Sequence, residues 1–280
     1  MKHFQKIALA CIIAAGLYMS ACNNGGNNKG SKDTSTVAQK IKEENISYIA
    51  GDSTMNSFIA YDESTDKKRP GVLIIPEWWG LNEYTKSRAR QLAALGYIAM
   101  AVDLYGYGKT ADNPDSAMKL AAPFYKDPHI AKTRFDAALE KLKGYAQADT
   151  HNMAAIGYCF GGAQVLNLAR LGEDLNGVVS FHGNLIGAPA NKDLLKAKIL
   201  VCHGEADQFV KPEEVKAFRK QMDSIGAAYT LKLYPGAEHS FTNPAATATG
   251  QKFNLPIAYN AAADSASWKD MMAFFDKIFK

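Results

Sequence analysis

The chain has 280 residues, 47% hydrophobic and 21% charged, so it can bury one large hydrophobic core or two small ones. This composition excludes a disordered or collagen-like chain. The formal net charge is only +4, and the basic residues are scattered among acidic ones, which argues against a protein that binds nucleic acid.

The N-terminus has the pattern of an export signal. Two lysines precede an apolar run at residues 7–17 that is too short to span a bilayer. The motif Met19-Ser20-Ala21-Cys22 resembles the lipobox of bacterial lipoproteins, which implies that Cys22 becomes the lipidated first residue. A plain secretory signal cut near Ala21, or a chance cysteine, are the alternatives.

Residues 23–36 are Gly, Asn, Ser and Lys with almost nothing to bury. We therefore expect a signal peptide over residues 1–21, a flexible tether over 22–44 and a single domain over 45–280. The protein is expected to be exported and anchored by lipid to the bacterial cell envelope, on the periplasmic side or the cell surface.

From about Asn45 onward, short apolar runs alternate with segments of helical spacing. Strands are expected at residues 46–49, 57–61, 71–75, 97–102, 153–156, 177–181, 198–202 and 228–234. Helices are expected at residues 82–95, 114–146, 162–171, 212–225 and 265–279, with a break between Pro123 and Pro128 in the second of them. Gly51-Asp52 indicates a hairpin turn between the first two strands. The alternation predicts one doubly wound, mostly parallel sheet with helices on both faces.

The cysteines point to a single reactive thiol. Cys11 leaves with the predicted signal and Cys22 carries the predicted lipid, so a disulfide framework is excluded for the exported body. Cys202 ends an apolar run and is expected to be a small core residue. Cys159 remains as the candidate nucleophile.

Cys159 stands in the stretch IGYCFGG, between a predicted strand and a predicted helix. Gly157 and Gly161 flank it at the spacing of a nucleophile elbow, where close packing of strand and helix leaves no room for Cβ atoms. A thiol at a helix N-terminus is favoured as thiolate, the attacking species. The alternative is a glycine-rich turn with an inert thiol.

Such a thiol needs a histidine and an orienting carboxylate, on loops after later strands. Asp207 follows the strand that contains Cys202, and Glu205 is its nearest competitor. His239 follows the strand at 228–234, as expected for the base. His129 and His151 are expected to face solvent. His182 and His203 end strands at the same edge, where they could line the pocket or stabilise turns.

These motifs together resemble the dienelactone hydrolase family of the α/β-hydrolase superfamily. The resemblance covers residues from about Ser47 to the C-terminus and includes the stretch EWWGLN that starts at Glu77. It implies the α/β-hydrolase fold and a catalytic triad of Cys159, Asp207 and His239. It also implies that Glu77 contacts the resting thiol as a gate, whereas capping of the following helix is the alternative for Glu77.

An oxyanion formed by attack on a carbonyl needs preorganised donors. By the geometry of the elbow, these are the backbone N–H groups of Phe160 and Trp78. Aromatic and polar side chains around them are expected to line the substrate pocket: Trp79, Tyr105, Tyr107, His182, Phe241 and Asn243.

The sequence departs from the family where arginines hold a substrate carboxylate, because Tyr107 and Asn243 occupy those positions. A phenol or an amide does not replace a bidentate guanidinium, so a neutral ester or lactone is expected rather than dienelactone itself. Lys109 is expected to be solvated.

We therefore expect a hydrolase that forms a thioester on Cys159, with no metal and no cofactor, since neither a metal-ligand cluster nor a phosphate-binding loop is present. An acyltransferase, a thiol peptidase or an inactive lipid-anchored binding protein are the alternatives. The expected partners are a small ester or lactone substrate and, through the lipid, a membrane; a monomer is favoured.

Overall fold

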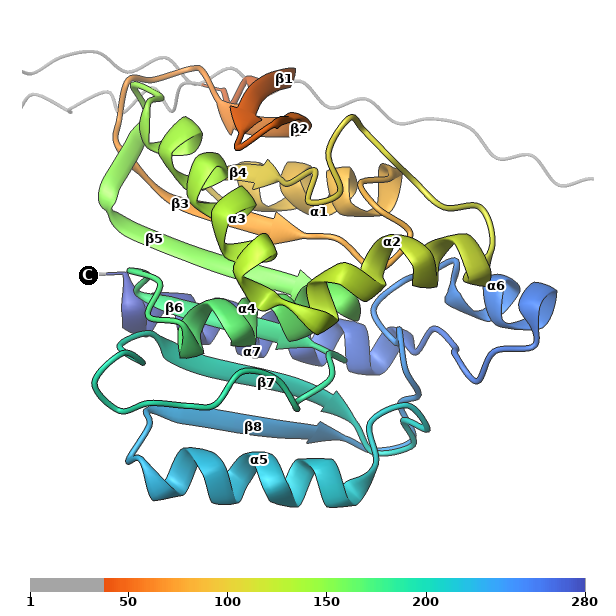
Figure 1. Cartoon of the computed structure of the whole chain (residues 1–280). Helices are drawn as coiled ribbons and strands as arrows, with labels where there is room; N and C mark the ends of the chain where they lie inside the picture. Colours follow the sequence, from red (N-terminus) through yellow and green to blue (C-terminus); the bar gives the residue numbers. More distant parts are fainter. Residues whose placement is uncertain (1–37, 280) are drawn as a thin grey trace, which may run out of the picture. The chain divides into compact units, whose positions relative to one another are not determined.

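The computed structural model describes residues 38–279, which form an eight-stranded sheet with helices on both faces (Figure 1). The strands are β1 (Ile41–Ala50), β2 (Ser53–Asp62), β3 (Arg69–Ile75), β4 (Ile98–Ala101), β5 (Ala148–Tyr158), β6 (Gly177–Phe181), β7 (Lys198–Gly204) and β8 (Tyr229–Tyr234). The helices are α1 (Glu83–Ala94), α2 (Pro114–Lys126), α3 (Pro128–Lys143), α4 (Phe160–Arg170), α5 (Pro212–Ser224), α6 (Ala246–Phe253) and α7 (Ala261–Ile278).

The strand order is β1-β2-β4-β3-β5-β6-β7-β8. Strands β3 to β8 pair in parallel, whereas β2 pairs antiparallel with both β1 and β4. The predicted hairpin is confirmed, with Gly51 in a left-handed conformation at its turn. Strand β1 begins at Ile41, so the folded domain starts inside the segment predicted as tether, and that boundary at residue 45 was placed too late.

Two apolar cores lie on the two faces of the sheet. Helices α3, α4 and α5 cover one face with residues such as Phe135, Leu166 and Phe218. Helices α1 and α7 cover the other face with residues such as Leu92 and Phe275. The central strands are buried on both sides, which explains why they read in the sequence as continuous apolar runs. The predicted doubly wound sheet is confirmed.

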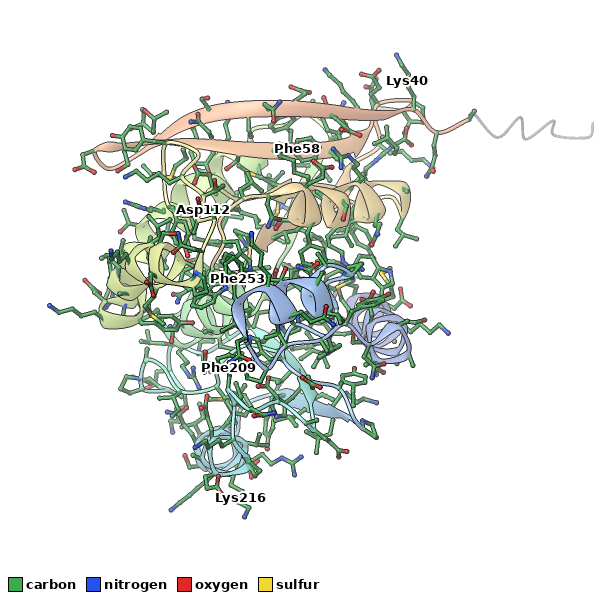
Figure 2. All side chains as sticks on the ribbon, turned by 90° about the vertical axis from the view of Figure 1, so that its right-hand side faces the viewer. Lys40, Phe58, Asp112, Phe209, Lys216 and Phe253 are labelled. Atoms are coloured by element: carbon green, nitrogen blue, oxygen red, sulfur yellow. The ribbon has the colours of Figure 1, made fainter. Side chains whose placement is uncertain are left out.

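The carboxyl ends of the parallel strands meet at one edge, where α2 and α6 lie over the sheet (Figure 1). Figure 2 looks onto this edge, with Phe253 of α6 and Phe209 toward the viewer. Helix α6 was not predicted, because its sequence ATATGQKF carries no regular apolar spacing. Its end at Asn254, a left-handed C-cap followed by Leu255 and Pro256, is the signal that could have revealed it.

The long helical stretch after β4 is broken at Asp127, as predicted. Asp127 ends α2 and its side chain caps α3, whose first residue is Pro128. Pro123 lies inside α2 rather than at its end. The last helix begins at Ala261, capped by Asn260, four residues earlier than predicted.

The predicted signal peptide and the lipidation site at Cys22 lie outside the described residues and stay predictions. Within residues 38–279, none of the helices combines the length and the apolar character that crossing a membrane requires.

Candidate active site

Cys159 lies at the sharp turn between β5 and α4, with φ 52° and ψ −114°. A side chain rarely adopts this backbone conformation, and its cost is offset only by tight surroundings. A Cβ on Gly157 would lie 2.0 Å from the Gly161 carbonyl oxygen, and one on Gly161 would lie 2.2 Å from the Ile75 carbonyl oxygen. The two glycines therefore let β3, β5 and α4 approach closely enough to hold the thiol at the sheet edge.

His239 and Asp207 come together as the sequence predicted. The His239 Nδ1 atom lies 2.8 Å from the Asp207 Oδ2 atom, and both side chains are buried. Asp207 also accepts hydrogen bonds from the backbone N–H groups of Phe209 and Val210, which fix its carboxylate. An ionised carboxylate is only an acceptor, so Nδ1 carries the proton and Nε2 is left for another partner. Glu205, the competing acid, is exposed.

The pKa of His239 reflects its two neighbours. Burial lowers this pKa, but attraction to the Cys159 thiolate and hydrogen bonds with Asp207 and Cys159 outweigh burial and raise the pKa well above its ordinary value. Burial raises the pKa of Asp207, yet the bond to His239 and the two backbone bonds leave it lowered. Cys159 and Asp207 on either side of the ring thus favour the protonated form of His239.

The two expected oxyanion donors are unengaged. The backbone N–H groups of Trp78 and Phe160 make none of the loop and cap hydrogen bonds of residues 38–279. Phe160 is the first residue of α4, where an N–H has no partner within the helix. Both groups therefore remain available to a ligand oxygen.

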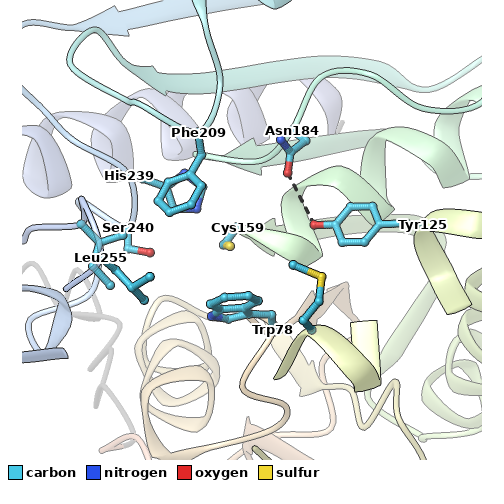
Figure 3. Close-up of a pocket in the computed structure, with 10 residues that line it drawn as sticks. Trp78, Tyr125, Cys159, Asn184, Phe209, His239, Ser240 and Leu255 are labelled. Atoms are coloured by element: carbon cyan, nitrogen blue, oxygen red, sulfur yellow. Dashed lines mark hydrogen bonds between the residues drawn. The ribbon is translucent and has the colours of Figure 1, made fainter. Parts of the chain in front are cut away.

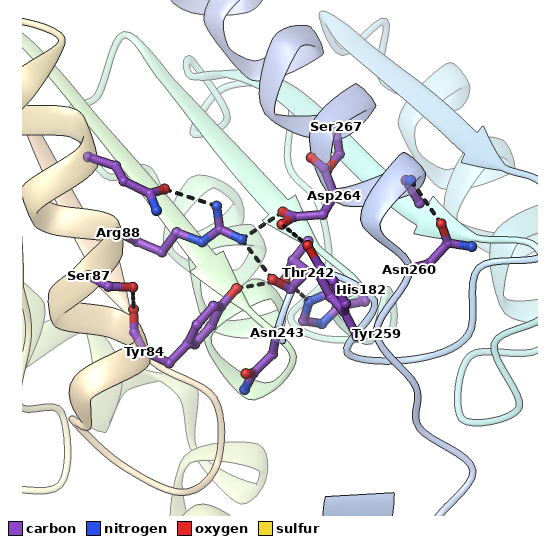
Figure 4. Close-up of polar contacts among 12 residues, drawn as sticks. Tyr84, Ser87, Arg88, His182, Thr242, Asn243, Tyr259, Asn260, Asp264 and Ser267 are labelled. Atoms are coloured by element: carbon purple, nitrogen blue, oxygen red, sulfur yellow. Dashed lines mark hydrogen bonds and ion pairs between the residues drawn. The ribbon is translucent and has the colours of Figure 1, made fainter. Parts of the chain in front are cut away.

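A chain of hydrogen bonds joins the elbow to the loop of His239. The Cys159 N–H donates to His182 Nδ1 at 3.0 Å. His182 Nε2 lies 2.7 Å from the Thr242 hydroxyl (Figure 4). Burial and the nearby His239 lower the pKa of His182 well below its ordinary value, so the ring is neutral. Its Nδ1 atom accepts, so Nε2 donates to Thr242. Thr242 and Tyr84 share a further hydrogen bond of 2.7 Å.

Arg88 holds the same loop, which contains His239 and Thr242, through a second set of contacts. It donates to the Thr242 carbonyl oxygen at 2.7 Å and forms an ion pair of 2.6 Å with Asp264 at the start of α7 (Figure 4). Its guanidinium also lies over the Tyr84, Tyr158 and Trp268 rings. Helices α1 and α7 therefore both fix the backbone three residues after His239.

Glu77 does not hold the thiol in this structure. Its Oε2 atom accepts a hydrogen bond of 2.7 Å from Asn243, and Oε1 has no partner among the described residues. Burial raises the pKa of Glu77, although the hydrogen bond from Asn243 and the nearby Ser240 side chain oppose this. The gate contact implied by the family resemblance is therefore not made. The capping alternative is also wrong, because Asn82 caps α1.

A cavity of about 260 Å³ opens over Cys159, whose side chain is partly exposed (Figure 3). Trp78, Cys159 and His239 belong to its wall, as expected. The other lining residues were not predicted: Met118, Tyr125, Asn184, Phe209, Ser240, Leu255 and Ile257. None of the ten lining residues is Asp, Glu, Lys or Arg, so apart from Cys159 and His239 the wall offers an ester only apolar, aromatic and neutral polar groups.

The six residues predicted to line the pocket lie elsewhere, so that prediction was wrong. Tyr107 is 55% exposed and its hydroxyl donates to the Asp52 carbonyl oxygen, near the hairpin. His182, Phe241 and Asn243 are buried behind the wall, while Tyr105 is buried and donates to the Trp78 carbonyl oxygen. Trp79 stacks on Phe253 of α6.

Other predictions on single residues are confirmed. His129, His151 and Lys109 are exposed, and Cys202 is buried, which raises the pKa of its thiol to about 12.

Among residues 38–279 no group of three or more His, Cys, Asp or Glu side chains is arranged to hold a metal ion.

Comparison with known proteins identifies the family of the chain. Residues 55–279 match the model of the dienelactone hydrolase family. The chain is 31% identical over 211 residues to "Protein usf" of Aquifex pyrophilus, which covers 74% of this chain and 87% of the relative. It is 30% identical over 179 residues to a putative carboxymethylenebutenolidase of Aquifex aeolicus, covering 62% of this chain and 77% of the relative.

A solved structure is also similar over most of the chain. It is described as a dienelactone hydrolase-like promiscuous phosphotriesterase from metagenomic libraries, and it superposes with a TM-score of 0.80 at 33% identity. The match covers 86% of this chain and 99% of that one. An α/β hydrolase from a deep-sea metagenome library shares the fold, with a TM-score of 0.61 at 17% identity. The chain therefore belongs to the dienelactone hydrolase family and is a hydrolase with the α/β-hydrolase fold.

Proposed function

We propose that the protein hydrolyses small carboxylic esters or lactones that are uncharged near the reacting carbonyl, through a thioester on Cys159. The observation that carries this proposal is the position of the Cys159 thiol in the wall of a cavity whose ten lining residues include no Asp, Glu, Lys or Arg, beside a histidine that is hydrogen-bonded to Asp207. The names of several relatives, among them putative carboxymethylenebutenolidases, also support a lactone or ester as substrate.

In the proposed reaction, the Cys159 thiolate attacks the acyl carbon and the N–H groups of Trp78 and Phe160 stabilise the oxyanion. The carbon–oxygen bond of the ester breaks, and the leaving alkoxide takes the proton of the His239 imidazolium. Neutral His239 then removes a proton from water, which attacks the thioester and releases the acid and the Cys159 thiolate. Asp207 keeps the His239 proton on Nδ1 throughout.

The scarcity of charge in the lining supports the choice of substrates that are uncharged near the ester. A carboxylate near the reacting carbon would lose its hydration, and the only cation among the ten lining residues is the His239 imidazolium, which Asp207 already pairs. A neutral phosphotriester meets the same requirement, and a relative is described as a promiscuous phosphotriesterase. A phosphotriester therefore belongs in the test.

The test compares wild type with Cys159→Ala on aryl and alkyl esters, lactones and one neutral phosphotriester. Wild type is expected to hydrolyse the short esters or lactones, with loss of at least about a thousandfold in kcat/KM for Cys159→Ala. A thiol-alkylating probe should abolish wild-type activity with one equivalent bound at Cys159. Equal turnover by both proteins contradicts the proposal. Product analysis with added amines or alcohols separates hydrolysis from acyl transfer.

A further inference from the structure

A second cavity adjoins the one that contains Cys159. It measures about 610 Å³, and Tyr125 and Asn184 line both cavities. The Tyr125 hydroxyl donates to Asn184 Oδ1 across a distance of 3.4 Å, a weak hydrogen bond between α2 and the loop after β6 (Figure 3). Among the lining residues, only Tyr125 and Asn184 belong to both cavities. An acyl chain of a substrate that passes between or over these two side chains therefore enters the second cavity.

The walls of the two cavities differ in polarity. The first has no Asp, Glu, Lys or Arg, whereas the second includes Lys126, His129, Asn167 and Glu214. The Glu214 carboxylate is engaged, because its Oε1 atom accepts from the backbone N–H groups of Leu185 and Ile186. The second cavity therefore has basic and amide donors that the first cavity lacks, apart from the Asn184 amide that both share.

One buried side chain next to the second cavity has donors without partners. Asn167 lines this cavity, and its Oδ1 atom accepts from the Ala188 N–H. Arg170 does not line the cavity; it is 1% exposed, and its Nε and Nη1 atoms have no partner among the described residues. A Cβ on Gly187 would lie 3.0 Å from Arg170 Nη1, so the guanidinium lies directly behind the wall formed by Gly187. Buried donors without acceptors are costly, and a ligand oxygen relieves that cost.

The position of the base, His239, determines how the substrate is oriented in the first cavity. The leaving alcohol takes its proton from His239, so it departs on the side of that residue. Figure 3 shows Cys159 between His239, Ser240 and Leu255 on one side and Tyr125 on the other. The Cys159 charge also raises the pKa of both His239 and Tyr125, although burial is the larger cause for Tyr125, so the thiol is near both. The acyl part therefore extends toward Tyr125 and Asn184.

We propose that the second cavity binds the distal end of the acyl group, and that this end carries an oxygen that accepts hydrogen bonds, as a hydroxyl or a carboxylate does. The substrate then has an apolar segment next to the ester carbonyl, in the first cavity, and an oxygenated end beyond the Tyr125–Asn184 pair. This inference rests on the function proposed above and adds the class of acyl group.

The test uses the full chain and aryl esters that share one leaving group. Three acyl series of increasing length end in a methyl group, a hydroxyl group or a carboxylate. At the length that reaches the second cavity, at least one oxygenated series is expected to exceed the methyl series about tenfold in kcat/KM, because the site then satisfies its unpaired donors. The hydroxyl and carboxylate series distinguish a neutral from a charged end.

The variant Ala188→Phe fills the second cavity without touching the first, and it is expected to remove the preference while the shortest ester is hydrolysed as before. The matched control is Ala262→Phe, at an exposed position of α7 outside both cavities, which should keep the preference. Equal rates for all three series at every length, or a preference unchanged in Ala188→Phe, overturn the inference. Continued hydrolysis of the shortest ester by wild type, but not by Cys159→Ala, would leave the proposed function standing.

Discussion

The carboxyl edge of the sheet and the wall above it are built in different ways. At the edge, Cys159, Asp207 and His239 follow directly on β5, β7 and β8, and parallel pairing fixes where those strands end. In the wall, Met118, Tyr125 and Leu255 come from α2 and from the segment after α6, which no strand carries. We infer that the edge determines the chemistry and the wall determines which substrate reaches it.

The largest expected effect at the edge is that of Asp207→Asn. The change keeps the shape but removes the charge that helps to raise the pKa of His239, and kcat/KM is expected to fall by about a hundredfold to ten-thousandfold. Because the imidazolium is less stable without that charge, the pKa of His239, followed by NMR titration of its ring, should move downward. A His239 pKa that stays or moves upward contradicts the coupling. Glu205→Gln, at the competing acid, is the control and should change little.

A smaller effect is expected where the edge is tied to the loop of the base. Thr242→Val removes the hydroxyl that receives the His182 proton and bonds Tyr84. Two buried groups then lack partners, so the free energy of unfolding should fall by about 1–3 kcal/mol and kcat by about tenfold, with KM little changed. Thr242→Ser keeps the hydroxyl and is expected to restore most of both. If Val and Ser behave alike in denaturation and turnover, the hydrogen-bond chain does not position the site.

The smallest effect is expected in the wall. Leu255→Ala enlarges the first cavity on the side of His239, so KM for esters with a bulky alcohol group should fall by a few-fold while kcat for the shortest ester is unchanged. Leu194→Ala, at an exposed leucine outside this cavity, is the control. A loss of kcat on every ester in Leu255→Ala would show that wall and edge are not separable.

The same contrast explains how much the sequence could predict. The end of a strand is visible in the sequence as an apolar run followed by polar residues or glycine. The elbow at Cys159 and the loops of Asp207 and His239 could therefore be located from the sequence. The order of the strands in the sheet could not be predicted from the alternation of strands and helices, and neither could the start of β1 at Ile41. The role of the triad itself stays a prediction until it is tested.

The wall could not be predicted because its residues share no local pattern. Tyr125 lies at the end of an ordinary helix, Asn184 in a loop and Phe209 on a turn, and only tertiary packing brings them over Cys159. Tyr107, in contrast, was expected at the pocket because of its place in the sequence after β4. Its left-handed backbone, with φ 58°, and its bond to Asp52 direct it to the hairpin instead.

One feature of the wall matters for laboratory evolution. Ile257 pairs with His239 in a short parallel bridge, and Asn260 donates to the Phe241 carbonyl oxygen, so the segment that contains α6 is fastened at its far end to the loop of the base. Residues 246–256 form an insert between fixed anchors, most of it outside the hydrophobic cores. Libraries confined to this insert should therefore diversify substrate choice with few unfolded members, because the fastening points and the sheet stay unaltered.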